Sequence, residues 1–291
     1  MAFYKNFIII STFFSLWLAV FFEKQTEDVF AFLLIFSFGI LHGANDLMLV
    51  KSLQKNDKEI GFYKTVLYYI GVVGMGVVLF YYFPIIGLLV FVLFSGYHFG
   101  EQHWEGKLPL KSPLKTITFL SYGLLILFLL FLTNASEVSL IIKDMTGLNL
   151  TYEFYKYVFI ACLCLFVVSI VFQGSLKKQY QSYIKEAFYL LVFYIVFKTA
   201  SLLWAFTIYF VLWHSLPSLI DQILHLYGSL TKKNMWLYFK SSALNWIVSL
   251  LGLLILYLIF NHKEQLFLSV FFSFLAAITF PHVLVMTRLK K

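Results

Sequence analysis

The sequence predicts an all-α fold, a polytopic integral membrane bundle of about ten (8–10) transmembrane helices. Of the 291 residues, 61% are hydrophobic and only 12% are charged. A soluble domain could not bury that much apolar surface. The apolar residues form recurrent runs, each close to the roughly 20 residues that a helix needs to cross a bilayer. Aromatic residues make up 21% of the chain, which is typical of proteins with aromatic belts at the membrane interfaces.

Ten apolar runs are the candidate spans, and we expect helices because lipid leaves no water to satisfy other backbone conformations. The runs are 5–22, 29–50, 62–82, 84–100, 116–133, 155–173, 185–198, 200–222, 242–260 and 266–287. Two details stay open. Pro84 either separates two spans or kinks a re-entrant pair. The stretch 185–222 holds either two spans or one long helix and a surface segment.

The basic residues explain the orientation of the chain. The formal net charge is +8, and most lysines fall in the loops after the second, fourth, sixth and eighth spans or at the C-terminus. The positive-inside rule then places both termini and these loops in the cytoplasm. Topology accounts for the charge better than a polyanion site, so we expect no nucleic-acid partner. The predicted protein is one domain, 1–291, that passes many times through the cell inner (cytoplasmic) membrane.

Four histidines lie near the ends of the second, fourth, eighth and tenth runs: His42, His98, His214 and His282. Even-numbered spans cross the bilayer in the same direction, so these imidazoles would differ in depth by only roughly 5 Å. An ionisable group inside a span is costly and usually marks a functional site. An all-imidazole set suits iron, copper or zinc. We therefore predict a metal centre inside the helical bundle. His225 and His262 are expected in loops and receive no role.

The first histidine motif runs from Gly39 to Asp46. His42 and Asp46 are four residues apart, so they share a helix face if the helix continues between them. A carboxylate beside a metal-binding imidazole can accept its second N–H and fix its tautomer. The alternative interpretation is that Asp46 only marks the cytoplasmic interface.

The second motif contains His98, Glu101 and His103. On a straight helix the two histidine rings would be about 140° apart, so both could bind one ion only if the helix ended between them. Gly100 would permit such an end. We interpret His103 as a hydrogen-bonding partner or a residue at the mouth of the pocket rather than a ligand. Glu101 is a candidate for orienting a ligand or carrying a proton.

The third motif surrounds His214. Pro217 has no N–H, so it leaves the carbonyl of Trp213 without its helical donor and favours a kink. Ser218 lies one turn beyond His214 and could hydrogen-bond to its ring. Asp221 lies two turns beyond it, and the alternative interpretation is that it only marks the interface. In the fourth motif a proline directly precedes His282 and would again distort the backbone.

The order of these motifs resembles the Brp/Blh family of β-carotene 15,15′-dioxygenases. The motifs are HGxxD, HFGxxxW, WHS and PHxxxM, and together they cover the chain from His42 to His282. The resemblance implies a carotenoid-cleaving membrane enzyme, an oxidoreductase that incorporates O₂. Such an enzyme uses one Fe(2+) per chain and O₂ as co-substrate to split β-carotene at its central double bond. The product, two molecules of retinal, would pass to a microbial rhodopsin.

The resemblance also implies a ligand set. His42, His98 and His214 match family histidines that are thought to bind the iron. Family members have a further histidine four residues after that of the WHS motif, and this chain has Ser218 there. Many also have Asp at the position of His103. The similar depth of His282 in its span favours it as the fourth ligand, and His103 is the alternative.

The substrate would be a carotenoid taken sideways from membrane lipid into an aromatic-lined tunnel. Core packing would also explain each candidate for its walls. The candidates are Phe38, Tyr97, Phe99, Trp204, Tyr209, Trp213 and Phe280.

Three other functions remain open from the sequence. The His98–His103 spacing resembles a box of membrane di-iron hydroxylases and desaturases, but the chain has only seven histidines and no HxxHH cluster. A haem-binding electron-transfer protein would typically place its ligands in pairs at two depths. A transporter with a histidine proton relay would bind no metal, and proline-broken spans are compatible with it.

Overall fold

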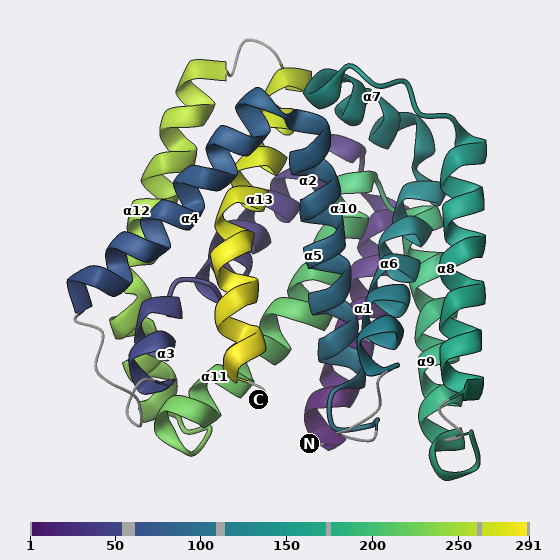
Figure 1. Cartoon of the computed structure of the whole chain (residues 1–291), viewed down its shortest axis with the longest axis horizontal. Coiled ribbons are helices and arrows are strands. Elements are labelled where there is room, and N and C mark those ends of the chain that lie inside the picture. Colours follow the sequence, from purple (N-terminus) through teal and green to yellow (C-terminus); the bar gives the residue numbers. More distant parts are fainter. Residues whose placement is uncertain (1, 54–61, 109–113, 173–175, 261–263, 290–291) are drawn as a thin grey trace. The chain divides into compact units, whose positions relative to one another are not determined.

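The computed structural model describes residues 2–53, 62–108, 114–172, 176–260 and 264–289. Every regular element among these residues is helical, without a strand. In chain order they are α1 (Ala2–Phe21), α2 (Lys24–Leu34), η1 (Ile35–Gly39), α3 (Asp46–Leu53), α4 (Phe62–Tyr82), α5 (Pro84–Trp104), α6 (Lys115–Thr133), α7 (Ala135–Thr146), α8 (Tyr152–Phe172), α9 (Leu176–Thr199), α10 (Leu202–Thr207), η3 (Ile208–Ser215), α11 (Leu216–Tyr227), α12 (Lys232–Phe260) and α13 (Glu264–Leu289). Figure 1 shows these helices.

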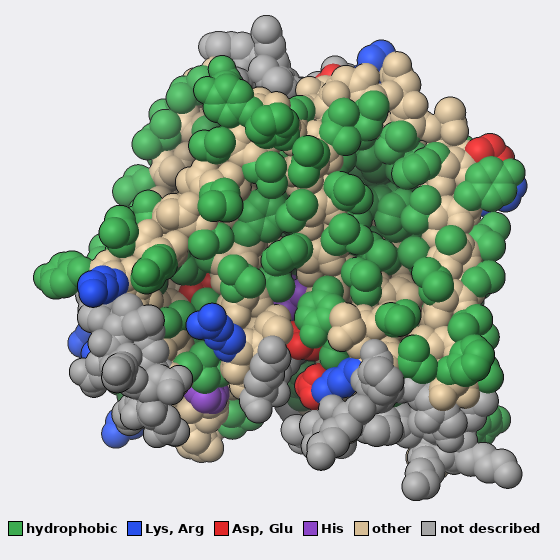
Figure 2. Space-filling model, in the orientation of Figure 1, with side chains coloured by type: hydrophobic (Ala, Val, Ile, Leu, Met, Phe, Trp, Pro, Cys, Tyr) green, Lys and Arg blue, Asp and Glu red, His purple; other side chains and the backbone are tan. Residues whose placement is uncertain are grey.

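Seven helical stretches in the described part of the chain are long and apolar enough to cross a membrane. They are Tyr63–Tyr82, Pro84–Trp104, Lys115–Thr133, Tyr152–Phe172, Leu202–Tyr227, Lys232–Ile259 and Ser269–Leu289. Hydrophobic side chains cover most of the face drawn in Figure 2, as a lipid-exposed surface requires. The predicted class, an all-α membrane protein, is confirmed. The count of about ten spans and the side on which the termini lie stay predictions.

Two predicted spans contain irregular helix. The span 29–50 begins as α2, continues through the π-helix η1, turns at residues 42–45 and resumes as α3. The span 200–222 consists of α10, the π-helix η3 and α11. The expected break near Ser201 is present, and its amide donates a hydrogen bond of 2.8 Å to Glu27 Oε2. π-helical turns are rare and occur often at functional sites.

The chain divides into two compact units, each assembled from separate segments. Unit 1 comprises Met1–Ser11, Val29–Gly87 and Thr207–Lys291, and unit 2 comprises Thr12–Asp28 and Leu88–Phe206. The prediction of one domain, 1–291, stays a prediction.

In unit 1, α13 packs against α4, α12 and α3. Gly76 on α4 makes this approach possible, because a Cβ there would lie 2.9 Å from the ring of Phe280 and 3.2 Å from Cα of Ala277 on α13. These contacts fix α13 relative to α4 at the level where α13 carries its histidine.

In unit 2, α6 packs against α8, α9 and α7. Glycines bring α5 and α6 into backbone contact. A Cβ on Gly100 would lie 1.7 Å from the carbonyl oxygen of Phe119, and a Cβ on Gly123 would lie 1.7 Å from that of Gly96. Small residues with this spacing are typical of close helix pairs in membranes. Gly100 therefore serves helix packing, and α5 continues through it to Trp104.

Candidate metal centre

Three histidines from distant parts of unit 1 meet in its interior. His42, His214 and His282 are all buried, and each offers one ring nitrogen within 4.8 Å of the others. The ring centroids of His42 and His282 are 4.7 Å apart, and those of His42 and His214 are 5.2 Å apart. The structure thus brings together three of the four histidines that the sequence singled out.

His42 stands at the turn that separates η1 from α3. The amide of Gly43 donates to the carbonyl of Ile40 and that of Ala44 to the carbonyl of Leu41, at 3.2 Å and 3.1 Å. These three-residue hydrogen bonds tighten and end the helix. The helix therefore does not continue from His42 to Asp46. Asp46 contacts a different histidine, His282, in place of the expected pairing. Nδ1 of His42 hydrogen-bonds to the carbonyl oxygen of Gly39.

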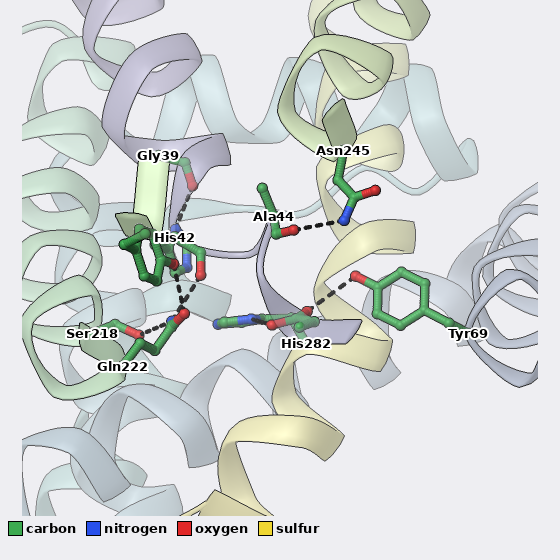
Figure 3. Close-up of polar contacts among 10 residues, drawn as sticks. Gly39, His42, Ala44, Tyr69, Ser218, Gln222, Asn245 and His282 are labelled. Atoms are coloured by element: carbon green, nitrogen blue, oxygen red, sulfur yellow. Dashed lines mark hydrogen bonds and ion pairs between the residues drawn. The ribbon is translucent and has the colours of Figure 1, made fainter. Parts of the chain in front are cut away.

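Polar side chains from other helices satisfy the carbonyls that this turn leaves without helical donors. Gln222 Nε2 donates to the carbonyl of His42 at 2.7 Å, and Asn245 Nδ2 donates to that of Ala44 at 2.9 Å (Figure 3). The hydroxyl of Tyr238 in turn donates to Gln222 Oε1 at 2.7 Å. Because a buried carbonyl without a partner is costly, these bonds hold the His42 turn in place.

The π-helix η1 also has a dedicated partner. Trp246 Nε1 on α12 donates to the carbonyl of Phe36 at 2.7 Å. This bond attaches the segment that leads to His42 to a second helix of the same unit.

His214 belongs to the π-helix η3. The amide of Leu216 donates to the carbonyl of Val211, five residues earlier, and Pro217 follows directly as an early residue of α11. The distortion expected from Pro217 is thus present as π-helical geometry. The ring of Phe210 stacks on that of His214, with centroids 5.7 Å apart, and meets that of His42 edge-on at 5.5 Å. Phe210 therefore packs against two of the three imidazoles.

His282 has a charged partner. Its Nδ1 lies 2.9 Å from Oδ1 of Asp46, and the hydroxyl of Tyr69 donates to Oδ2 of the same carboxylate at 3.0 Å. In Figure 3 the hydroxyl of Tyr69 points toward the place where His282 lies. A Cβ on Gly43 would lie 3.7 Å from Nδ1 of His282, so this glycine packs directly on the imidazole. Helix α13 runs through Pro281 without a break.

The donor set fits a divalent transition-metal ion. In His42 and His282 the hydrogen-bonded Nδ1 faces an oxygen acceptor, so the N–H belongs there and Nε2 carries the lone pair. Partners of this kind fix the tautomer and orientation of metal-binding imidazoles. Three imidazoles at this separation suit iron, copper or zinc.

His98, the remaining predicted ligand, belongs to unit 2. It is 1% exposed, and its Nδ1 lies 3.9 Å from Oε2 of Glu101. The hydroxyl of Tyr97 donates to Oε1 of Glu101 at 3.4 Å. Because α5 remains helical from His98 to His103, the condition for both to bind one ion is not met. The role of His98 as a ligand stays a prediction.

His103 instead belongs to a buried ion-pair network around Glu186. Its Nδ1 lies 2.9 Å from Glu186 Oε2, and Lys107 Nζ and the hydroxyl of Tyr122 donate to the same carboxylate at 2.7 Å and 2.6 Å. A buried carboxylate requires such partners. Glu186 was not among the predicted site residues, because it lies 83 residues from His103 on another helix. Its position as a charged residue within the predicted span 185–198 was the sequence feature that could have identified it.

The remaining predicted residues of the His214 motif have other contacts. Ser218 Oγ accepts a hydrogen bond of 3.1 Å from Gln222 Nε2, which also holds the His42 turn. Asp221 is exposed, as expected for an interfacial residue. His225, expected in a loop, lies in the last turn of α11 and is 3.1 Å from Ser52 Oγ. His262 lies outside the described residues.

The aromatic tunnel candidates fall in both units. In unit 1, Tyr209, Trp213 and Phe280 are buried, whereas Phe38 is 41% exposed. The others, Tyr97, Phe99 and Trp204, belong to unit 2. The indole of Trp204 donates to the carbonyl of Ser15 at 3.1 Å, as a packing residue would. A cavity of about 260 Å³ in unit 2 is lined by apolar side chains of α6, α8 and α9, and none of the candidates lines it.

Fold and site together define a helical membrane protein with a buried three-histidine group suited to a metal ion. The model of the beta-carotene 15,15'-dioxygenase family matches residues 33–290, and the chain belongs to this family. The match includes all three clustered histidines and confirms the resemblance seen in the motifs. Comparisons with curated proteins and with solved structures found no match.

Proposed function

We propose that this protein is an Fe(II)-dependent dioxygenase of the inner membrane that cleaves β-carotene at its central double bond and forms two molecules of retinal. Its family supports the class of reaction and substrate. The observation that carries the proposal is the buried group of His42, His214 and His282. A hydrogen-bonded Nδ1 in two of these rings assigns the lone pair to Nε2.

The choice of iron rests on the motif resemblance, which implies Fe(2+), and on redox chemistry, which excludes zinc from the metals that suit this site. Insertion of O₂ into a hydrocarbon needs a redox-active centre, and zinc has no redox chemistry. When bound by these imidazoles, Fe(II) would supply the activation of O₂ that amino-acid side chains lack. We propose one iron per chain.

The protein's own contribution is to bind the substrate and exclude water. β-Carotene has no polar group, so it would be bound by apolar contacts after entering from membrane lipid. Phe210 packs directly on two of the histidines, and Tyr209 and Trp213 are buried on the same π-helix. Such apolar surroundings favour a hydrocarbon substrate and keep competing water reactions away from the site. We propose that Tyr209, Trp213 and Phe280 contact the polyene and that retinal passes to a microbial rhodopsin.

The direct test is expression in a bacterium that produces β-carotene, with retinal measured by chromatography. The expected result is loss of the orange pigment and accumulation of retinal. His42→Ala and His214→Ala should abolish retinal formation. His225→Ala is the matched control, because this histidine lies outside the three-histidine group. Unchanged pigment with abundant, folded wild-type protein would refute the proposal.

A further inference from the structure

Three side chains form a hydrogen-bonded chain behind one histidine of the metal centre. The hydroxyl of Tyr69 on α4 donates to Asp46 Oδ2 at 3.0 Å. Oδ1 of Asp46, the first residue of α3, lies 2.9 Å from Nδ1 of His282 on α13. Helices α3, α4 and α13 pack against one another in unit 1. The chain therefore connects three helices whose mutual packing fixes its geometry.

Burying the Asp46 side chain costs free energy, which its hydrogen-bonding partners must offset. Asp46 is 1% exposed, and a carboxylate removed from water is unfavourable unless it is hydrogen-bonded. Both of its oxygens have a partner, one in Tyr69 and one in His282. Hydrogen bonds to charged groups are also stronger than those between neutral groups.

The imidazoles of His42 and His282 differ in the charge of the group that their Nδ1 atoms face. Nδ1 of His42 faces the neutral carbonyl of Gly39, whereas Nδ1 of His282 faces a carboxylate. A carboxylate behind an imidazole fixes its tautomer and raises the basicity of the other ring nitrogen. His282 should therefore be the more strongly electron-donating of these two ligands.

We propose that Asp46, held in place by Tyr69, is a positioning residue that keeps Nε2 of His282 as a strong metal-binding nitrogen. The inference rests on the proposed metal centre and deepens it, because it assigns unequal roles to the histidines. Asp46 acts on the ion only through His282, and Tyr69 acts only through Asp46.

The test is a titration of the purified, metal-free protein in detergent with Co(II), followed by its ligand-field absorption. Asp46→Asn retains groups that can hydrogen-bond to both neighbours but removes the charge. Asp46→Ala removes both the charge and the hydrogen bonds. Loss of an orienting partner typically lowers metal affinity by about 10–100-fold. We expect the largest decrease in Co(II) affinity for Asp46→Ala, a smaller one for Asp46→Asn and the smallest for Tyr69→Phe.

The absorption spectrum separates positioning from a structural role. If His282 no longer binds the ion, the Co(II) spectrum of Asp46→Ala should approach that of His282→Ala. Tyr69→Phe should have no further effect on affinity in the Asp46→Ala background, because coupled residues are not additive. If Tyr69 only stabilised the fold, Tyr69→Phe would leave the Co(II) spectrum unchanged. Its effect on affinity would then add to that of Asp46→Ala in the double variant.

Matched controls come from unit 2. Glu27→Gln changes a buried carboxylate that accepts a hydrogen bond from the amide of Ser201. Tyr155→Phe removes a hydroxyl that hydrogen-bonds to Ser139. Neither lies in the three-histidine group, so both should bind Co(II) as the wild type does.

The outcomes distinguish this inference from the proposed function. If His42→Ala and His214→Ala bind Co(II) as the wild type does, the metal centre itself is wrong. If those variants lose the ion while all Asp46 and Tyr69 variants keep wild-type affinity and spectrum, only the positioning role is overturned. Should Asp46→Ala fail to fold, Asp46→Asn and Tyr69→Phe still decide the question.

Discussion

Nδ1 of His282 lies 2.9 Å from a carboxylate oxygen of Asp46, although 236 residues separate them in the chain. This contact joins the last helix, α13, to α3, which follows the His42 turn. Two of the clustered histidines are thereby linked through a short stretch of backbone from His42 to Asp46. A change at this turn should therefore affect both.

Replacing His282 with alanine removes one of the three clustered imidazoles. We expect the variant to lose bound iron and retinal formation. Its metal affinity should fall by more than the about 10–100-fold that is typical when a ligand loses its hydrogen-bonding partner. Metal content of the purified protein and retinal yield are the measurements. His225→Ala should match the wild type in both. Full iron content in the His282 variant would exclude it as a ligand.

His98→Ala tests the one predicted histidine ligand that lies outside the three-histidine group. If the resemblance assigns this residue correctly, the variant should lose metal affinity as the His214 variant does. Metal titration of both proteins under the same conditions gives the comparison. Wild-type affinity in His98→Ala would limit the protein ligands to the three histidines of unit 1.

Removal of the metal should lower the stability of the folded protein. A ligand that binds only the folded state stabilises it by RT ln(1 + [L]/Kd), or about 2.7 kcal/mol at a free concentration of 100 times Kd. Thermal unfolding in detergent should therefore shift to lower temperature when a chelator is added. His214→Ala should show no such shift, because its site is incomplete. An equal response of both proteins would indicate that the chelator acts elsewhere.

Gln222→Leu should destabilise the His42 turn. The change removes the donor to the carbonyl of His42 and the acceptor of the Tyr238 hydroxyl. A buried polar group left without a partner costs about 1–3 kcal/mol. We expect a lower unfolding temperature together with weaker metal binding. Gln25→Leu, at an exposed position of α2, is the control and should change neither quantity.

Gly100→Ala should separate α5 from α6. Its Cβ would lie 1.7 Å from the carbonyl oxygen of Phe119, which leaves no room without a backbone shift. Overpacking typically costs about 1–3 kcal/mol, and more where backbone must move. Thermal unfolding in detergent measures the effect. Gly71→Ala, where a Cβ would meet nothing within 4 Å, should be tolerated, and equal damage by both changes would contradict the packing argument.

Several features of the site followed from the sequence because they depend on local pattern. His42, His214 and His282 were singled out by their similar positions in parallel spans, and the structure places them together. The motif order also predicted the family, which the family model confirms. A helix end near Ser201 was visible as a polar break, and Pro217 indicated the irregular helix around His214.

Other features depended on contacts that no local pattern contains. The sequence suggested that Asp46 would face His42 one helical turn away, but the turn at residues 42–45 directs it to His282 instead. Likewise, Glu186 binds His103 from a helix far along the chain. In both cases the spacing rule for a straight helix fails because the helix ends or because the partner lies on another helix.

The sequence by itself determined that this chain is a helical membrane protein, because long apolar runs in lipid can satisfy their backbone groups only within helices. It also determined which imidazoles are candidates, since a histidine in an apolar span is conspicuous. Only the tertiary structure decided which carboxylate meets which imidazole. Those partners come from separate helices, and the packing of α3, α4 and α13 brings them within hydrogen-bonding distance.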